Sequence, residues 1–255
     1  MPARRERTHI LTELFEELDF RDTRLGDLVL RRRSAPSLGG KSIYEVILDG
    51  QFLMSSLVNY SEIALVELGL APLEGDALEV IVGGLGLGYS ADTALANDRV
   101  SSLLVVECLA DVIRWHREGL VPLGEKLCAD ERCRIVHGDF FALIDSHGAG
   151  VDSEQPGRRF DAILVDIDHS TDILIHGSHT GFYKPKGLRK LLTHLKPGGV
   201  FALWSAERPA ANFVAVLDEV FASHEVHEIA FNNPLLNFDD INTVYVARAP
   251  GRERL

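Results

Sequence analysis

The sequence predicts an α/β fold: a mostly parallel sheet of seven strands with helices on both faces, preceded by a small antiparallel β appendage. Three observations predict it. From about residue 77 onward, short apolar runs typical of buried strands alternate with stretches whose apolar residues recur at helical spacing. A Gly-rich turn follows the first of these strands. Before residue 58, strand-like runs flank an Asp-Gly pair, which is typical of a hairpin.

Composition sets the broad class of protein. The chain has 255 residues, 46% of them apolar, and its 26 Lys and Arg against 38 Asp and Glu give a net charge of −12. An acidic chain binds phosphate backbones poorly, so we expect no nucleic-acid partner. No apolar run is long enough to cross a bilayer and no signal-peptide pattern follows the charged N-terminus, so we expect a cytoplasmic protein without a membrane partner. The odd number of cysteines (Cys108, Cys128 and Cys133) favours reduced thiols.

The first expected domain covers residues 1–57. Its opening segment has apolar residues at helical spacing, which predicts a short amphipathic helix. Strands are predicted over 28–30, 44–48 and from 51, with Asp49-Gly50 as the hairpin turn between the last two. The basic segments 31–33 and 37–41 are predicted to be loops between strands. The residues that predict the opening helix are Ile10, Leu11, Leu14, Phe15 and Leu18.

The second expected domain covers residues 58–255. A helix is predicted over 60–70, where the last residues include Gly69 and precede Pro72. Predicted strands cover 77–82, 102–107, 134–136, 160–166, 200–204, 224–230 and 243–247. The predicted helices between them cover 89–95, 109–116, 188–195 and 213–220. Lys196-Pro197-Gly198-Gly199 is predicted to end the third of these helices.

Two strand ends indicate a nucleoside site, because ligands of parallel α/β sheets bind outside the carboxyl ends of the strands. Gly84, Gly86 and Gly88 permit a sharp turn and a close approach of the ligand, although the same turn also forms without a ligand. Glu107 ends the next strand, where a carboxylate accepts hydrogen bonds from both hydroxyls of a ribose. A solvated loop glutamate is the alternative.

Two further strand ends carry aspartates. Asp139 can reach the amino group of an adenine, or it can cap the helical turn that begins at Phe140. Asp166 ends the following strand, and Asp168 and His169 come directly after it. A carboxylate beside a nucleoside site can hold or deprotonate a nucleophile. Capping or turn formation is the alternative for both Asp166 and Asp168.

The polar segment from Asp168 to Tyr183 is predicted to form a lid over the acceptor site. It contains His169, His176 and His179, which could ligate a metal together with a neighbouring aspartate. Loop histidines more often contact solvent or substrate, so we expect no metal. Of the two tryptophans, Trp115 is expected in the core, and Trp204, at a strand end, is expected to line the acceptor pocket.

These residues together resemble the spermidine synthase-like branch of class I S-adenosylmethionine-dependent transferases. The resemblance implies the Rossmann-like class I methyltransferase fold, S-adenosylmethionine or its decarboxylated form as cofactor, and a homodimer. It places Cys108 and Phe140 beside the cofactor as well. The matching segments are the Asp49-Gly50 hairpin, Tyr60-Ser61-Glu62, the glycines from Gly83 to Gly88, Val106-Glu107, Gly138-Asp139, the strand from Phe160 to Asp166, and Phe182-Tyr183.

The chain also departs from the family at three positions. Gly86 stands where the family has an aspartate that holds the amine of decarboxylated S-adenosylmethionine and repels the carboxylate of the undecarboxylated cofactor. His169 replaces the second aspartate after the fourth strand, and Trp204 replaces a polar residue after the fifth. The adenosine half of the expected site is therefore complete, and the amine half is altered.

Two enzyme functions follow, and methyl transfer is preferred. In this hypothesis Asp166 orients or deprotonates a small, amine-containing acceptor, assisted by Asp168, His169 or Tyr60. The alternative is a polyamine aminopropyltransferase with a divergent amine pocket, and a minor alternative is a non-catalytic nucleoside-binding protein. The side chains expected to line the acceptor pocket are His176, His179, Tyr183 and Trp204.

Overall fold

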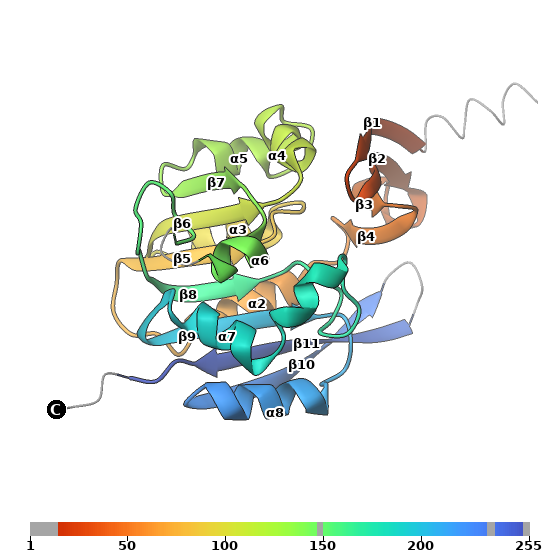
Figure 1. The fold of residues 1–255 in the computed structure, drawn as a ribbon. Coiled ribbons are helices and arrows are strands. Elements are labelled where there is room, and N and C mark those ends of the chain that lie inside the picture. Colours follow the sequence, from red (N-terminus) through yellow and green to blue (C-terminus); the bar gives the residue numbers. More distant parts are fainter. Residues whose placement is uncertain (1–14, 147–149, 234–237, 252–255) are drawn as a thin grey trace, which may run out of the picture.

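The computed structural model describes residues 15–146, 150–233 and 238–251. It contains a four-stranded antiparallel sheet followed by a seven-stranded sheet covered by helices (Figure 1). The smaller sheet has the order β1-β2-β3-β4. Its elements are β1 (Phe15–Thr23), β2 (Gly26–Ala35), the 3-10 helix η1 (Pro36–Leu38), β3 (Lys41–Leu48) and β4 (Gln51–Ser55).

The helix predicted at the N-terminus is wrong where the structure describes it. Phe15 and Leu18 lie in strand β1, which pairs antiparallel with β2, and Ile10, Leu11 and Leu14 lie outside the described residues. The short apolar spacing fits a helix or a strand equally well. Pairing with β2, which follows β1 after only two residues, decides the outcome.

The segment 31–33 is also not the loop that its charges predicted, because it continues strand β2. Glu45 lies on the neighbouring strand β3 and accepts hydrogen bonds from Arg31 Nε and Arg33 Nε, each at 2.6 Å. Opposite charges on adjacent strands stabilise such a pairing. The predicted hairpin turn is confirmed, since Asp49 and Gly50 both have positive φ angles, 49° and 74°.

The larger sheet has the order β10-β11-β9-β8-β5-β6-β7. Strands β5 to β9 run parallel, and β10 and β11 are antiparallel, as the predicted fold class requires. The elements are α2 (Tyr60–Leu70), β5 (Leu78–Gly83), α3 (Tyr89–Ala96), β6 (Val100–Glu107), α4 (Ala110–Arg117), α5 (Gly124–Ala129), β7 (Cys133–His137), α6 (Phe140–Asp145), β8 (Phe160–Val165), η2 (Gly177–Gly181), α7 (Pro185–Leu192), β9 (Leu195–Ser205), α8 (Ala211–Val220), β10 (Ser223–Asn233) and β11 (Phe238–Arg248).

One predicted helix end is misplaced. Helix α7 already ends at Leu192, and the Pro-Gly-Gly segment lies inside strand β9. There it causes a shift in pairing, because Leu195 pairs with Phe160 whereas Val200 pairs with Ala162. Extra residues in one strand of a pair form a bulge, for which glycine is well suited. Helix α5 was not predicted.

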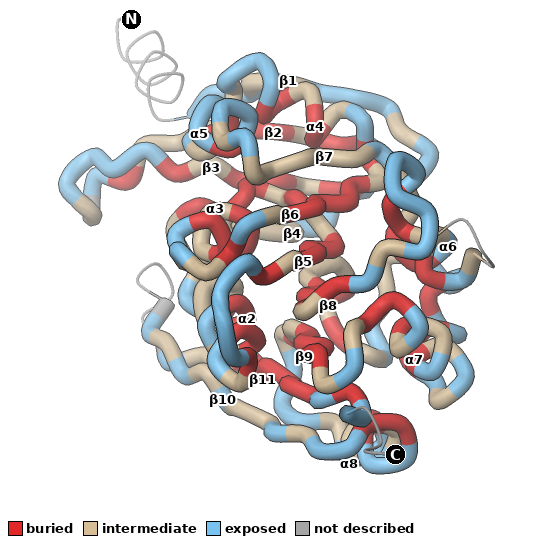
Figure 2. Tube along the Cα trace, turned by 90° about the vertical axis from the view of Figure 1, so that its left-hand side faces the viewer, coloured by how far each residue is buried: buried red, intermediate tan, exposed pale blue. Residues whose placement is uncertain are grey.

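The core fills both faces of the larger sheet. Val80, Val82 and Leu164 pack with α2, α3 and α4 on one face, whereas Ile81 and Ile163 pack with α6, α7 and α8 on the other. The buried colouring of β5, β6, β8 and β9 in Figure 2 follows from this double cover. No helix in the described part of the chain is long and apolar enough to cross a membrane.

The two sheets are joined by contacts as well as by the chain. Trp115 of α4 is fully buried, as predicted, and its indole N–H donates a hydrogen bond to Asp19 of β1 at 2.7 Å. Arg114 of the same helix also pairs with Asp19. The chain passes from one sheet to the other between Ser55 and Tyr60. This connection brings β4 close to the carboxyl ends of the parallel strands.

Candidate functional site

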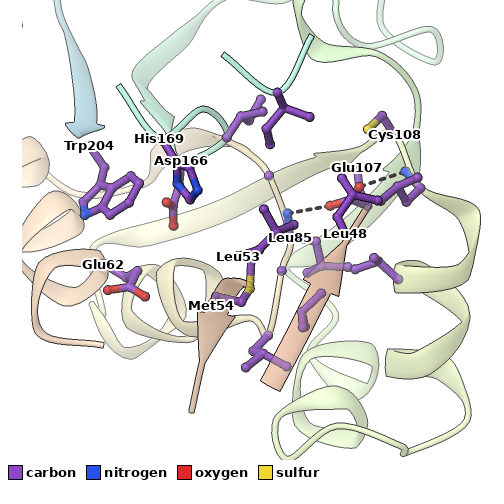
Figure 3. Close-up of a pocket in the computed structure, with 18 of the residues that line it drawn as sticks. Leu48, Leu53, Met54, Glu62, Leu85, Glu107, Cys108, Asp166, His169 and Trp204 are labelled. Atoms are coloured by element: carbon purple, nitrogen blue, oxygen red, sulfur yellow. Dashed lines mark hydrogen bonds between the residues drawn. The ribbon is translucent and has the colours of Figure 1, made fainter. Parts of the chain in front are cut away.

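A cavity of about 710 Å³ lies between the smaller sheet and the carboxyl ends of β5, β6 and β8. Three of the predicted strand-end acids, Glu107, Asp139 and Asp166, line it. Figure 3 shows Asp166, His169, Trp204 and Glu62 at one end and Glu107 with Cys108 at the other. Met54 of β4 lies between these two ends. The topology thus brings together residues from both sheets.

The Gly-rich turn forms one wall of the cavity. Gly84 and Gly88 have φ angles of 95°, and Gly86 has a φ angle of 48°. A Cβ atom at Gly84 would lie 2.1 Å from the Asp166 carbonyl oxygen, so no side chain fits there. A Cβ atom at Gly86 would lie 2.6 Å from the Met54 sulfur. Met54 therefore occupies the space into which a side chain at position 86 would extend.

Glu107 is held at the end of β6 by two backbone groups. Its Oε2 accepts a hydrogen bond from the Leu85 amide at 3.0 Å, and its Oε1 accepts one from the Leu109 amide at 2.8 Å (Figure 3). Each carboxylate oxygen has a second lone pair for a ligand. Burial and the charge of Glu107 raise the pKa of the neighbouring Cys108 to about 12, so that thiol stays protonated at neutral pH.

Asp139 caps helix α6. Its Oδ1 accepts hydrogen bonds from the amides of Phe141 at 3.0 Å and Ala142 at 3.2 Å. The capping interpretation is therefore confirmed. Asp139 and Phe140 line the cavity at the same time, so capping leaves the carboxylate at the cavity wall.

Asp166 and Glu62 are two acidic side chains whose charges interact. The Ser90 hydroxyl donates a hydrogen bond to Asp166 Oδ2 at 2.7 Å, and burial raises the pKa of Asp166 to about 6. Glu62 of α2 accepts a hydrogen bond from the Ser61 hydroxyl at 3.0 Å. Burial, and then the charge of Asp166, raise the pKa of Glu62 to about 7. Both groups can therefore exchange protons near neutral pH.

Glu62 and Met54 are site residues that the sequence patterns did not predict. For Met54 no sequence signal is found, whereas Glu62 has one. Its sequence signal is its place in Tyr60-Ser61-Glu62 at the start of a helix. The packing of α2 against the sheet, which turns this side chain toward Asp166, is a tertiary feature.

Asp168 does not line the cavity. Its carboxylate is almost fully buried and accepts hydrogen bonds from the Ile175 amide at 2.7 Å, His179 Nδ1 at 2.9 Å and the Tyr183 hydroxyl at 2.8 Å. Tyr183 is likewise buried outside the cavity lining. The two side chains hydrogen-bond to each other instead and thereby fix the segment that follows β8.

Of the remaining predicted residues, Cys108, His169, His176, His179 and Trp204 line the cavity. Tyr60 does not; the residue is 54% exposed, and its ring stacks on Phe231 with 6.1 Å between ring centroids. Across the described ranges, no group of three or more His, Cys, Asp or Glu side chains is arranged to hold a metal ion.

The cavity lining is strongly acidic. Arg24 is the only Lys or Arg among the described residues that line it. Glu45 is neutralised by Arg31 and Arg33, and the other acidic side chains give the cavity a negative potential. The acidic residues of the lining are Glu45, Glu62, Glu107, Asp139, Asp166 and Asp240.

The chain was compared with protein-family models and with solved structures. No protein-family model matches the chain. Spermidine synthase from Thermotoga maritima superposes with a TM-score of 0.66 at 18% sequence identity, over 91% of this chain and 72% of that one. A spermidine synthase in complex with the transition state analogue AdoDATO gives 0.67 at 17% identity, over 91% and 73%. The chain has the fold of the spermidine synthases.

This fold agrees with the resemblance that the sequence motifs carry. The spermidine synthase neighbours match the aminopropyltransferase alternative by name, and they give the preference for methyl transfer no support. Within the spermidine synthase fold, the departure at Gly86 has a structural counterpart, since the Met54 sulfur lies beside that position.

Proposed function

We propose that the protein transfers an aminopropyl group from decarboxylated S-adenosylmethionine to an amine. The charge of the cavity carries this proposal: besides Glu45, which Arg31 and Arg33 neutralise, five acidic residues line it, against one arginine among the described lining residues. Decarboxylated S-adenosylmethionine has a sulfonium and an ammonium group and no carboxylate, and amine acceptors are cations at neutral pH. An acidic, partly enclosed cavity favours ligands of this charge. It disfavours the carboxylate of S-adenosylmethionine, for which Arg24 is the only Lys or Arg among the described lining residues.

The nucleoside is proposed to lie at the end of the cavity that holds Glu107 and Cys108. Glu107 keeps lone pairs for the ribose hydroxyls after its two backbone contacts are made. Asp139 and Phe140 are the proposed neighbours of the adenine. The glycines of the turn then allow the sulfonium end of the donor to approach the backbone beside Asp166.

The amine is proposed to lie at the other end, between Asp166 and Glu62. Asp166 orients the amine nitrogen and accepts one of its protons, and Trp204 covers the site with an apolar face. The bound donor supplies an electrophilic carbon and a neutral thioether as leaving group. The protein contributes orientation, exclusion of water and a proton acceptor. A nitrogen–carbon bond forms, the carbon–sulfur bond breaks with its electron pair on sulfur, and the proton ends on Asp166.

Methyl transfer is the second candidate, and one observation favours it. Position 86 carries no carboxylate, whereas the family resemblance implies an aspartate that selects the decarboxylated donor. Met54 fills the corresponding space. A donor that retains its carboxylate therefore avoids one repulsive contact.

Product analysis tests the proposal. The protein is incubated with decarboxylated S-adenosylmethionine or with S-adenosylmethionine, each with a panel of primary amines and diamines, and the nucleosides are separated by chromatography. We expect methylthioadenosine from the decarboxylated donor, formed only when an amine is present. S-adenosylhomocysteine instead would establish methyl transfer. Binding of both donors without either product would support the non-catalytic alternative.

A further inference from the structure

We propose that Ser90 is a positioning residue: its hydroxyl keeps Asp166 as the ionised carboxylate and leaves the proton that the two acids share on Glu62. This inference rests on the proposed function, in which Asp166 accepts a proton from the amine. Ser90 itself does not line the cavity, so it acts through Asp166.

The Ser90 hydroxyl donates its hydrogen bond to the Asp166 carboxylate rather than to the backbone of its own helix. Ser90 lies in the first turn of α3, is 5% exposed, and donates to Asp166 Oδ2 at 2.7 Å. Serine and threonine hydroxyls in helices often bond to a backbone carbonyl of the preceding turn instead. Thr93, one turn further along α3, does so, donating to the Tyr89 carbonyl at 2.8 Å. The serine and threonine hydroxyls of α3 thus have different partners, and only that of Ser90 reaches Asp166, directly after β8.

The main chain of Asp166 is fixed as well, so the carboxylate cannot easily turn away. Its amide donates to the Gly83 carbonyl at 2.9 Å, and its own carbonyl packs against Gly84. In the described chain, the hydrogen bond from Ser90 is the only one found for the Asp166 side chain. Burial favours the protonated form of Asp166, and this hydrogen bond opposes burial by stabilising the charged form.

The groups that face Asp166 come from four elements. They are Ser90 of α3, Glu62 of α2, His169 after β8 and Trp204 of β9. Glu62 is the acidic member of this set, and its charge and that of Asp166 repel each other. When two acids interact in this way, their protons leave in two steps, and the better stabilised carboxylate ionises first, so that between the steps the other acid holds the remaining proton. Tyr89 lies nearby and interacts with Glu62.

The hydrogen bond from Ser90 favours the charged form of Asp166, because a donor lowers the pKa of the carboxyl group that accepts from it. Glu62 also accepts hydrogen bonds, from its own amide and from Ser61 at 3.0 Å, yet burial and the charge of Asp166 still raise its pKa above that of Asp166. With Asp166 ionised and Glu62 protonated, the pair carries one negative charge, and this affects how easily the acceptor amine loses its proton. Two negative charges beside an ammonium group would hold its proton more tightly than one, and only the neutral amine is nucleophilic.

The variant Ser90→Ala tests the inference, with Thr93→Ala as the matched control on the same helix. In Ser90→Ala we expect the acid limb of the kcat–pH profile to move up by about one pH unit. Binding of methylthioadenosine, measured by calorimetry, and the KM of the donor should stay unchanged. Thr93→Ala should leave the profile in place, and Ser90→Thr, which keeps the hydroxyl, should restore it. An unmoved acid limb in a folded Ser90→Ala protein would overturn the inference.

A second measurement needs neither a variant nor turnover. Infrared spectra of the wild-type protein, labelled with ¹³C at the carboxyl carbon of glutamate or of aspartate, are recorded near neutral pH. The band of the buried protonated carboxyl group should shift with glutamate labelling and not with aspartate labelling. The reverse result would place the proton on Asp166 and overturn the inference. Failure of the proposed function is distinct, because the wild-type protein would then form no methylthioadenosine from the decarboxylated donor.

Discussion

Asp166 lies at one end of the cavity, opposite the end that holds Glu107 and Cys108. We expect Asp166→Asn to lower kcat by about 10²–10⁴-fold, which is the usual contribution of a general base. Binding of methylthioadenosine should change little, because the proposed nucleoside contacts lie at the Glu107 end. Steady-state kinetics and calorimetry on the same preparation check both expectations. A variant with full kcat would exclude Asp166 as the proton acceptor.

The raised pKa values also predict how stability depends on pH. Burial raises the pKa of Glu62 from 4.5 to about 7, so between these values the native state holds a proton that the unfolded state has lost. Stability contributed by this group is therefore present at low pH and falls as the pH rises through that range. We expect Glu62→Gln to raise the free energy of unfolding by about 1–3 kcal/mol at alkaline pH.

Below the ordinary pKa of a glutamate the same substitution should have little effect, because both states are then protonated. Chemical denaturation of wild type and Glu62→Gln at an acidic and an alkaline pH measures the difference. An equal effect at both pH values would contradict the origin assigned to the pKa shift.

At the scale of elements, the segment between β8 and α7 depends on one buried carboxylate. Asp168 accepts hydrogen bonds from His179 Nδ1, the Tyr183 hydroxyl and the Ile175 amide. An amide in its place turns one acceptor into a donor that faces other donors. We expect Asp168→Asn to lower the free energy of unfolding by about 2–4 kcal/mol, measured by denaturant titration. Tyr183→Phe, which removes a single hydrogen bond, is the milder control at about 1 kcal/mol. An unchanged stability in Asp168→Asn would refute the anchoring role.

The elements that the sequence predicted well are those whose signal is local. The apolar strands, the Gly-rich turn and the Asp49-Gly50 hairpin depend on neighbouring residues, and all are present. Strand β1 and the basic end of β2 were missed because their partners on other strands, such as Glu45, decide their structure. In the site, strand ends located Glu107, Asp139 and Asp166 at the cavity.

The sequence pattern did not predict the direction in which each side chain points. Asp166 and Asp168 are two residues apart, yet Asp166 faces the cavity and Asp168 turns into the protein. The turn after β8 separates them, and no periodicity describes that turn. Glu62 joins the site only through the packing of α2.

At the scale of the whole molecule, two sheets enclose one acidic cavity. The smaller sheet contributes Met54, and it is tied to the larger one by the contact of Asp19 with Trp115. The net charge of −12 is concentrated in part at the cavity, which five acidic residues line besides the neutralised Glu45, with Arg24 as the one Lys or Arg among the described lining residues. The proposed selection of a cationic donor follows from this distribution of charge rather than from any one residue.

Calorimetric titration with the two donors tests this selection most directly. Decarboxylated S-adenosylmethionine and S-adenosylmethionine are titrated separately into the wild-type protein, with Glu107→Ala as the control in which binding of both should be weakened. The charge of the cavity predicts that the decarboxylated donor binds at least about tenfold more tightly, a difference of about 1.4 kcal/mol. Equal affinity, or tighter binding of S-adenosylmethionine, would contradict the proposed aminopropyl transfer.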